Sequence, residues 1–471
     1  MSQLPEGWAG CKLKTAVDKI VGGGTPSKSI PSYFGGTIPW MTVKDMNKLF
    51  LTDTIDHITD DAVKNSSTNV IPAGTPIIAT RMSLGKIVRA SFDSAINQDL
   101  KALFVNKHIN QYYFEHWYRS QSIKIESLGT GTTVKGIRLE VLHELDFPLA
   151  PLAEQTRIVT KLDEVLAQVD TIKARLDGIP AILKRFRQSV LAAAVSGKLT
   201  EEWRGSPSTS FNQPPITIGN ESNDAPKTWT WTKLLDLAKL ESGHTPRKSK
   251  LEYWDAGDVY WICLQDIRAA HGKIIEDTKF KPTMKGIENS SARLLPKGTV
   301  CFSRDISVGY TTIMGKEMST TQHFANWICG EQLFNKYLMF ALMAAKRHLT
   351  DNGQGTTVKT IYMPALKEFY LLTPPIDEQK EIVRLVDQYF AFADTIEAQM
   401  KKAQMRVDKL TQAILAKAFR GELTADWRAA NPDLISGDNS GAALLARIMA
   451  ERATASGKKG KHGTSKARAM A

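Results

Sequence analysis

"PLAEQTRIVTKLDEVLAQVDTIKA" (residues 151–174) recurs as "PIDEQKEIVRLVDQYFAFADTIEA" (residues 375–398), displaced by 224 residues and without a gap. The match resumes at the same displacement, where "QSVLAAAVSGKLTEEWR" (188–204) falls on "QAILAKAFRGELTADWR" (412–428). A period of this length is far longer than one solenoid repeat, so it indicates a duplicated domain followed by a duplicated helix.

Both copies carry apolar residues at alternating steps of four and three, which is the heptad pattern of a coiled coil. Two such seams in one chain can bury each other, so we predict an intramolecular antiparallel coiled coil; two separate core helices are the alternative. Pro180 should kink or restart the first helix, because proline removes a backbone hydrogen bond. The predicted seam consists of Ile158, Leu162, Val165, Val169, Ile172 and Leu176, and of Ile382, Val386, Tyr389, Ala393, Ile396 and Met400.

The stretches before the two helices correspond more loosely. "GGTP" (23–26) matches "GHTP" (243–246), and "GTGTTVKG" (129–136) matches "GQGTTVKT" (353–360). Short apolar runs separated by Gly and Pro favour a strand-rich fold in both stretches. We therefore predict the fold class α+β, with two strand-rich α/β domains in pseudo-repeat separated by the two long helices.

The predicted segments follow from this duplication and from local composition. Residues 205–224 are rich in Ser, Pro, Asn and Gly, which is typical of a linker, and the end of the chain is basic and poor in apolar residues, which predicts disorder. The segments are a first strand-rich domain (1–150), a first long helix (151–204), the linker (205–224), a second strand-rich domain (225–374), a second long helix (375–428), and a C-terminal segment with a disordered basic tail (429–471).

Composition narrows the possible functions. The 471-residue chain carries a net charge of +12, with the basic excess in residues 225–370 and 440–471, which favours an acidic partner such as nucleic acid. The start of the chain does not resemble a signal peptide and no long apolar run is present, so we expect a cytoplasmic protein that does not contact the membrane. The four cysteines have neither zinc-site nor disulfide spacing, which predicts reduced thiols and no metal.

Sequence motifs for catalysis are absent. Every Gly-Lys pair is followed by a residue other than Ser or Thr, so there is no P-loop, and neither HExxH nor G-x-S-x-G occurs. A DNA-methyltransferase motif of the Asn/Asp-Pro-Pro-aromatic type is also missing. We expect no catalytic site and no cofactor in this chain; a fused methyltransferase or nuclease with diverged motifs remains the alternative.

The repeated GTTVK turn suits a phosphate contact or a buried turn equally well. Two copies of a non-catalytic domain on a rigid spacer favour a long ligand with two equivalent sites, and duplex DNA is such a ligand; a stand-alone DNA-binding regulator is a further alternative. Arg favours guanine and Gln favours adenine in the major groove. The candidate DNA-binding residues are Lys28, Arg81, Lys86, Gln98, Thr132, Thr133 and Lys135 in the first domain, and Arg247, Lys248, Lys250, Arg304, Gln322, Thr356, Thr357 and Lys359 in the second.

The helical repeats and "LTQAILAKAFRGELTADWRAANPDLISG" (410–437) resemble conserved regions of type IA specificity subunits of type I restriction-modification enzymes, over essentially the whole chain. The resemblance implies two target-recognition domains that each read one half of a split DNA sequence. It also implies that the helices dock two methyltransferase subunits and that two restriction subunits join them, for adenine-N6 methylation and ATP-dependent cleavage of double-stranded DNA. S-adenosylmethionine, ATP and Mg are then cofactors of the partner subunits.

Overall fold

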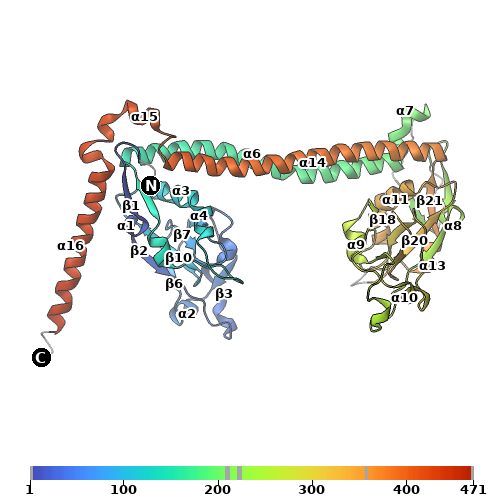
Figure 1. The fold of residues 1–471 in the computed structure, drawn as a ribbon, viewed down its shortest axis with the longest axis horizontal. Helices are drawn as coiled ribbons and strands as arrows, with labels where there is room; N and C mark the ends of the chain where they lie inside the picture. Colours follow the sequence, from blue (N-terminus) through green and yellow to red (C-terminus); the bar gives the residue numbers. More distant parts are fainter. Residues whose placement is uncertain (1–3, 207–212, 220–224, 356–358, 468–471) are drawn as a thin grey trace. The chain divides into compact units, whose positions relative to one another are not determined.

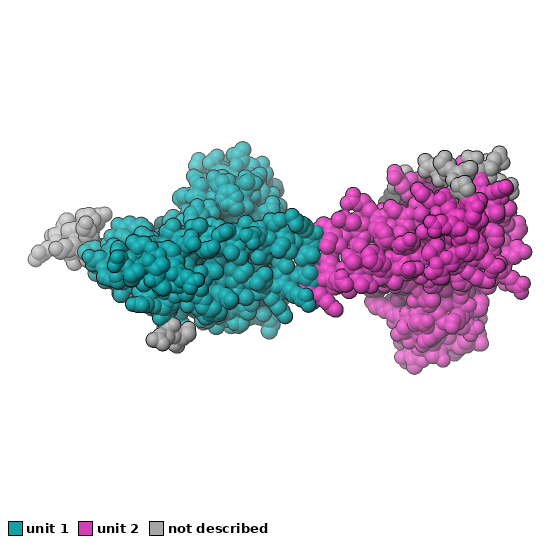
Figure 2. All heavy atoms as spheres, turned by 90° about the horizontal axis from the view of Figure 1, so that it is seen from above, with its two compact units in different colours: residues 1–176, 403–471 teal, residues 177–402 magenta. Residues whose placement is uncertain are grey.

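A computed structural model describes residues 4–206, 213–219, 225–355 and 359–467, with side chains up to Thr454. The chain divides into two compact units, which Figure 2 colours separately. Unit 1 comprises Met1–Leu176 and Ala403–Ala471, and unit 2 comprises Asp177–Lys402. The helices α6 (Leu152–Val195) and α14 (Ile376–Phe419) contribute residues to both units.

The two long helices pack side by side (Figure 1). In unit 1, Ile158 near the start of α6 shares a core with Phe419 at the end of α14. In unit 2, Val195 at the end of α6 shares a core with Ile382 near the start of α14. Because the start of each helix meets the end of the other, the pair is antiparallel, as the heptad pattern predicts.

The predicted seam residues differ in their burial. Ile172 and Tyr389 lie at the exposed edge of the pair, with 47% and 40% of their surface accessible. An α-helix of 3.6 residues per turn drifts from a strict seven-residue repeat, and Leu166 is buried where the strict pattern places Val165, which is only half-buried. Tyr389 remains in edge contact with Phe186 of α6, at 6.2 Å between ring centroids. The other seam residues are buried (Ile158, Leu162, Val169, Ile382, Val386, Ala393 and Met400) or half-buried (Leu176 and Ile396).

Pro180 does not restart the first helix, because α6 continues through it to Val195. Pro180 is exposed, so water can reach the backbone carbonyl that loses its partner there. Leu183, one turn later, is buried and holds the helix in its packed position.

Each unit contains a five-stranded sheet with the same strand order. The order in unit 1 is β2-β10-β7-β8-β4, and in unit 2 it is β14-β20-β17-β18-β16. The strands of unit 1 are β2 (Val17–Gly22), β10 (Leu100–Val105), β7 (Ile77–Ala79), β8 (Ile87–Ala90) and β4 (Phe50–Leu51); those of unit 2 are β14 (Ala238–Ser242), β20 (Phe324–Cys329), β17 (Val300–Ser303), β18 (Thr311–Met314) and β16 (Ile274–Ile275).

Smaller sheets and short helices complete the units. A second sheet, of order β5-β3-β9-β6, occurs in unit 1, and a β15-β19 pair occurs in unit 2. Apart from a strand in the predicted linker, the other strands are β1 (Ala9–Lys12), β11 (Asp146–Leu149), β3 (Phe34–Met41), β5 (Asp56–Ile58), β6 (Asn69–Ile71), β9 (Ser94–Ile96), β13 (Thr230–Lys233), β15 (Trp261–Ile262), β19 (Ser319–Thr320) and β21 (Phe369–Thr373). The helices before the GTTVK turns are α3 (Gln111–Ser120) and α4 (Ser122–Ser127), and α11 (Asn335–Ala344) and α12 (Lys346–Asp351).

Two segments differ from the sequence-based expectation. The predicted linker contains a strand, β12 (Ile216–Ile218), which pairs with β21, because Ile216 is fully buried there. The predicted disordered tail is helical in α16 (Gly441–Ala467). Leu444 and Ile448 of α16 lie one turn apart and bury against the core of unit 1, which accounts for the start of this helix. Among the described residues, no helix combines the length and the apolar character needed to cross a membrane.

Candidate nucleic-acid interface

Three segments that are distant in sequence meet in unit 1: the loop after β7 (residues 80–85), the turn before β10 (97–99) and the GTTVK hairpin (129–136). Backbone hydrogen bonds join them. The Thr80 amide donates to the carbonyl of Asp99 at 2.8 Å, and the Ile137 amide donates to the carbonyl of Thr80 at 2.9 Å. The loop and the hairpin therefore share one frame.

The same frame recurs in unit 2, displaced by 224 residues. The Arg304 amide donates to the carbonyl of His323 at 3.0 Å, and the Ile361 amide donates to the carbonyl of Arg304 at 2.8 Å. Each GTTVK segment also closes as a hairpin, through paired backbone bonds of Thr130 with Gly136 and of Gln354 with Thr360. In both units the residues that flank the motif are thus paired with each other and tied to the loop after the third strand of the five-stranded sheet.

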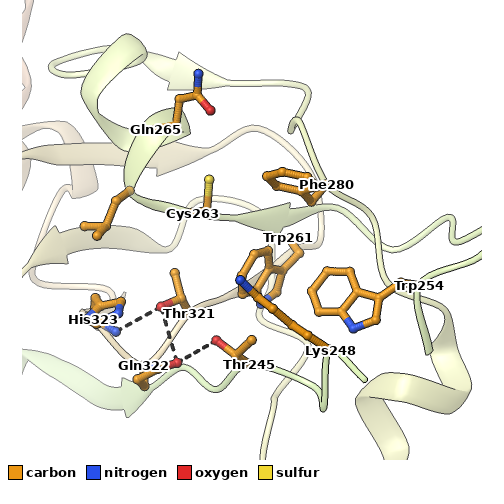
Figure 3. Close-up of a pocket in the computed structure, with 11 residues that line it drawn as sticks. Thr245, Lys248, Trp254, Trp261, Cys263, Gln265, Phe280, Thr321, Gln322 and His323 are labelled. Carbon is orange, nitrogen blue, oxygen red and sulfur yellow. Dashed lines mark hydrogen bonds between the residues drawn. The ribbon is translucent and has the colours of Figure 1, made fainter. Parts of the chain in front are cut away.

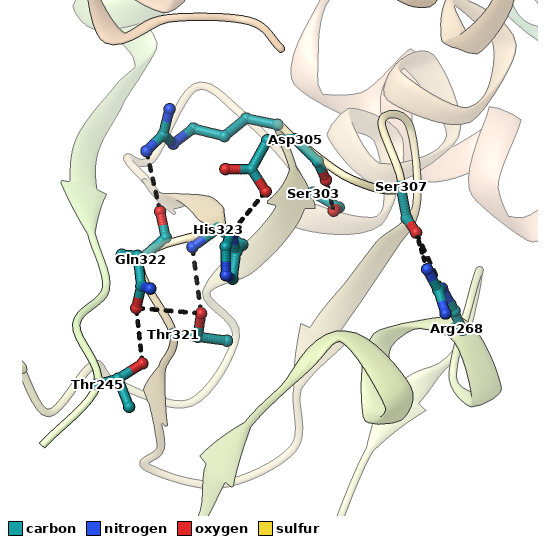
Figure 4. Close-up of polar contacts among 9 residues, drawn as sticks. Thr245, Arg268, Ser303, Asp305, Ser307, Thr321, Gln322 and His323 are labelled. Carbon is teal, nitrogen blue, oxygen red and sulfur yellow. Dashed lines mark hydrogen bonds and ion pairs between the residues drawn. The ribbon is translucent and has the colours of Figure 1, made fainter. Parts of the chain in front are cut away.

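A threonine–glutamine pair borders the frame in both units. Thr245 donates through its hydroxyl to Oε1 of Gln322 at 2.6 Å (Figure 4), and Thr25 makes the equivalent bond to Gln98. Both glutamines are exposed. Because the threonine donates to the amide oxygen, each glutamine keeps its amide nitrogen as a donor for other groups.

Beside this pair, equivalent positions carry an acidic and a basic side chain in contact, with their places exchanged between the units. In unit 1 the cation is on the loop, with Arg81 Nη1 at 3.4 Å from Asp99 Oδ1. In unit 2 the loop carries Asp305, whose carboxylate lies 2.6 Å from Nδ1 of His323. The same backbone frame therefore presents different side chains in the two units.

The candidate residues of unit 1 lie on or around this frame. Arg81 and Gln98 belong to it, and Thr132, Thr133 and Lys135 are exposed on the hairpin. Lys86 Nζ donates to Asn47 at 2.7 Å, and Lys28 is exposed in the loop that carries Thr25. Desolvation lowers the pKa of the neighbouring Lys101, an effect that Asp99 partly offsets.

In unit 2 the structure brings Arg304 and Gln322 together, since an Arg304 Nη donates to the Gln322 carbonyl at 3.0 Å. Lys359 Nζ donates to the Gly353 carbonyl at 3.1 Å, within the hairpin. Arg247, Lys248 and Lys250 are exposed on the loop after Thr245. Thr356 and Thr357 lie outside the described residues.

A cavity of about 590 Å³ opens beside the Thr245–Gln322 pair (Figure 3). The sequence did not predict this cavity, because its aromatic residues come from separate loops and share no sequence motif. Trp261, which is equivalent to Trp40 of unit 1, lines the cavity and is buried, as Trp40 is. The lining includes Thr245, Lys248, Trp254, Trp261, Cys263, Gln265, Phe280, Gln322 and His323.

The chemistry of this cavity fits binding better than catalysis. Desolvation and the hydrogen bond to Asp266 raise the pKa of the Cys263 thiol, so the sulfur is held in its protonated, unreactive form. Trp254 and Trp261 pack edge to face at 5.2 Å and present aromatic surface beside exposed amides. The sequence signal that could have found Thr25 and Thr245 was the "GGTP" and "GHTP" repeat.

Two units that repeat one exposed loop cluster on a shared frame, with differing side chains, define a duplicated recognition protein. The family model of the type I restriction modification DNA specificity domain matches residues 5–181 and again residues 226–404. The chain belongs to the family of type I restriction enzyme specificity subunits.

Relatives and solved structures agree with this assignment. The chain is 35% identical over 477 residues to the StySPI specificity subunit of Salmonella potsdam, covering 97% of this chain and 98% of the relative. It is 34% identical to the EcoKI specificity subunit of Escherichia coli (strain K12), with the same coverage. The fold matches the HsdS subunit of Thermoanaerobacter tengcongensis with a TM-score of 0.52 at 20% identity, covering 89% of this chain and 98% of that one. A chain from a structure of type I R-M complex assembly gives a TM-score of 0.63 at 18% identity, covering 90% and 100%.

Proposed function

We propose that this chain is a non-catalytic subunit that reads a bipartite DNA target, one half-site with each unit, across a spacer that neither unit reads. The observation that carries the proposal is the duplication of the loop, turn and hairpin frame with altered side chains. A shared frame keeps the mode of docking the same, while Arg81–Asp99 and Asp305–His323 present different groups. The candidate Arg, Lys, Gln and Thr residues contact bases and phosphates.

The paired helices also bind partner subunits in this proposal. Exposed apolar side chains on the helices support it, since Ile182 and Phe392 are 57% and 59% accessible in unit 2, and Met405 and Leu410 are 59% and 49% accessible in unit 1. Exposed apolar surface on a helix pair suits an interface with another protein. Two methyltransferase subunits dock there and two restriction subunits join them, and these partners supply the sites for S-adenosylmethionine, ATP and Mg. The assembly works in the cytoplasm, methylating adenine at N6 and cleaving unmodified DNA.

Adenine methylation mapped across the genome, in strains with and without this chain, tests the proposal. We expect N6-methyladenine at one two-part motif, which disappears when the gene is deleted and returns with a plasmid copy. The proposal fails if the modified motif persists in the deletion strain.

A domain exchange tests independent reading by the two units. Replacing residues 1–146 by the first domain of another specificity subunit should change one half of the motif and leave the other half and the spacer as they were. The matched control exchanges residues 225–370 and should change the opposite half. A change in both halves after either exchange contradicts independent reading.

A further inference from the structure

An exposed apolar side chain projects from the same loop in both units. Met82 is 63% accessible and Ile306 is 51% accessible, and the two are 224 residues apart. Single exposed apolar residues are ordinary on protein surfaces. The backbone conformation at these two positions is not ordinary.

Both residues occupy the left-handed region, with φ of 63° at Met82 and 54° at Ile306. In each loop the following serine amide donates two residues back, from Ser83 to the Arg81 carbonyl at 2.7 Å and from Ser307 to the Asp305 carbonyl. This is the rare γ-turn with a positive φ, which is strained for a bulky or β-branched side chain. Glycine fits such a position without steric cost. The stability of the fold therefore favours glycine at Met82 and Ile306, which we call the loop tips. Both tips instead carry an apolar side chain that stays exposed and so adds no hydrophobic stabilisation.

Both loops are anchored to the rest of their unit. Leu84 and Val308, two residues beyond each tip, are 8% and 7% accessible and anchor the loops in the two cores. The Met82 amide donates to the Lys135 carbonyl of the GTTVK hairpin at 3.0 Å, and Arg268 Nε donates to the Ser307 hydroxyl at 2.9 Å. Figure 4 shows the Ser307–Arg268 contact and, apart from it, the contact of Asp305 with His323. Both loops are thus anchored on either side of the exposed apolar side chain.

Cations lie beside both tips and favour a polyanion as the occupant, although Asp305, which contacts His323, directly precedes Ile306. Arg81 precedes Met82 directly, and Lys135 lies on the hairpin that holds it. Arg304 and Arg268 flank the loop of Ile306. Apolar wedges of Met, Ile, Leu or Phe next to Arg and Lys are the means by which many proteins part stacked base pairs.

We propose that Met82 and Ile306 are wedges that insert between stacked base pairs, one in each half of the target. The proposal rests on the proposed function, because it requires the two units to dock on one duplex. Each wedge unstacks one base-pair step. The protein keeps the strained apolar residue instead of glycine because its side chain is needed when DNA is bound. A pair of wedges also loosens the duplex in each half-site, as a reaction on a base inside the stack requires.

The test uses the complete complex of this chain with its methyltransferase subunits, on a duplex with the target read from the methylation map. 2-Aminopurine, which brightens when it is unstacked, replaces one base at a time along both half-sites. The wild-type complex should brighten the probe at one step in each half. Met82→Gly should abolish the rise in the first half and keep it in the second, Ile306→Gly should do the reverse, and each should weaken DNA binding by about tenfold.

Two controls separate wedging from folding. Ile55→Ala removes an equally exposed side chain of unit 1, at 64% accessibility, and should leave both signals unchanged. The glycine variants should unfold at the same temperature as the wild type or higher, because glycine relieves the left-handed strain.

Four outcomes overturn the proposal. Probe signals in Met82→Gly and Ile306→Gly that equal the wild type show that the side chains do not enter the stack. A wild-type complex that methylates its target but brightens no probe shows the same. Glycine variants that lose the methyltransferase subunits during purification show that the tips dock protein. A wild-type complex that methylates no specific site overturns the proposed function, and the wedges with it.

Discussion

The strongest prediction on stability concerns a buried ion pair that joins the start of one long helix to the segment after the other. In unit 1, Glu154 is fully buried and accepts hydrogen bonds from Arg428 at 2.5 Å, Thr424 at 2.7 Å and Trp8 at 2.7 Å. In unit 2, the fully buried Glu378 accepts from Arg204 at 2.8 Å and Thr200 at 2.7 Å. The repeated "LTEEWR" and "LTADWR" stretches supply the arginine and threonine donors.

The substitution Glu154→Gln keeps the shape of the side chain and removes its charge. It leaves Arg428, whose side chain is 14% accessible, as a cation without a counter-ion. It also places the amide NH2 of the new glutamine beside groups that are themselves hydrogen-bond donors. Breaking a buried pair from one side costs about 3–5 kcal/mol. A loss of this size is a large part of the 5–15 kcal/mol that typically holds a domain folded.

Urea unfolding followed by fluorescence should show the loss, and hydrogen–deuterium exchange should locate it. Glu154→Gln should raise exchange in β1 and β11, and Glu378→Gln should raise it in β13 and β21. The matched control is Glu422→Gln, which removes an exposed partner of Arg420 and should change neither measurement. If Glu154→Gln is as stable as Glu422→Gln, the ion pair does not hold the helix end and the reasoning is refuted.

Further predictions concern the helices and pH. Val386→Asp places a charge at a fully buried seam position and should abolish folding of unit 2. Phe392→Asp, at a position 59% accessible, should keep the circular dichroism spectrum but no longer co-purify with the methyltransferase subunit. If Phe392→Asp still retains this partner, the proposed docking surface is wrong. Burial and the nearby Arg119 lower the pKa of His116 in spite of its contact with Asp163 at 3.0 Å, so the unfolded state binds more protons than the folded state. The free energy of unfolding should therefore fall as the pH drops below about 6.5, and level off below the pKa of the folded state. If His116→Gln shows the same dependence on pH, this histidine is not the cause.

Sequence periodicity was sufficient for the helices and the duplication, because a heptad pattern is repeated over many turns. It failed at single seam positions such as Ile172, where small angular drift decides between burial and exposure. The strand Ile216–Ile218 was not predicted, because three residues within a segment rich in Pro, Ser and Asn are too few to show an alternating pattern. Within the candidate interface, arginine and glutamine could be chosen by their chemistry, whereas the left-handed tips could not, because neither Met82 nor Ile306 is a residue that signals positive φ.

The division of the chain into its two units has a consequence for synthesis. Unit 2 is a single continuous stretch, Asp177–Lys402, whereas unit 1 needs residues from both ends of the chain. On a ribosome, the first domain therefore emerges long before Phe419 and Leu444, which complete its core, have been made. The second domain can close first, although it is translated later, and the first must wait with Ile158 and Tyr113 incompletely covered. A translation pause or a chaperone would thus act chiefly on the N-terminal domain, and nonsense mutations near residue 400 should spare the fold of the second domain while leaving the first prone to aggregation.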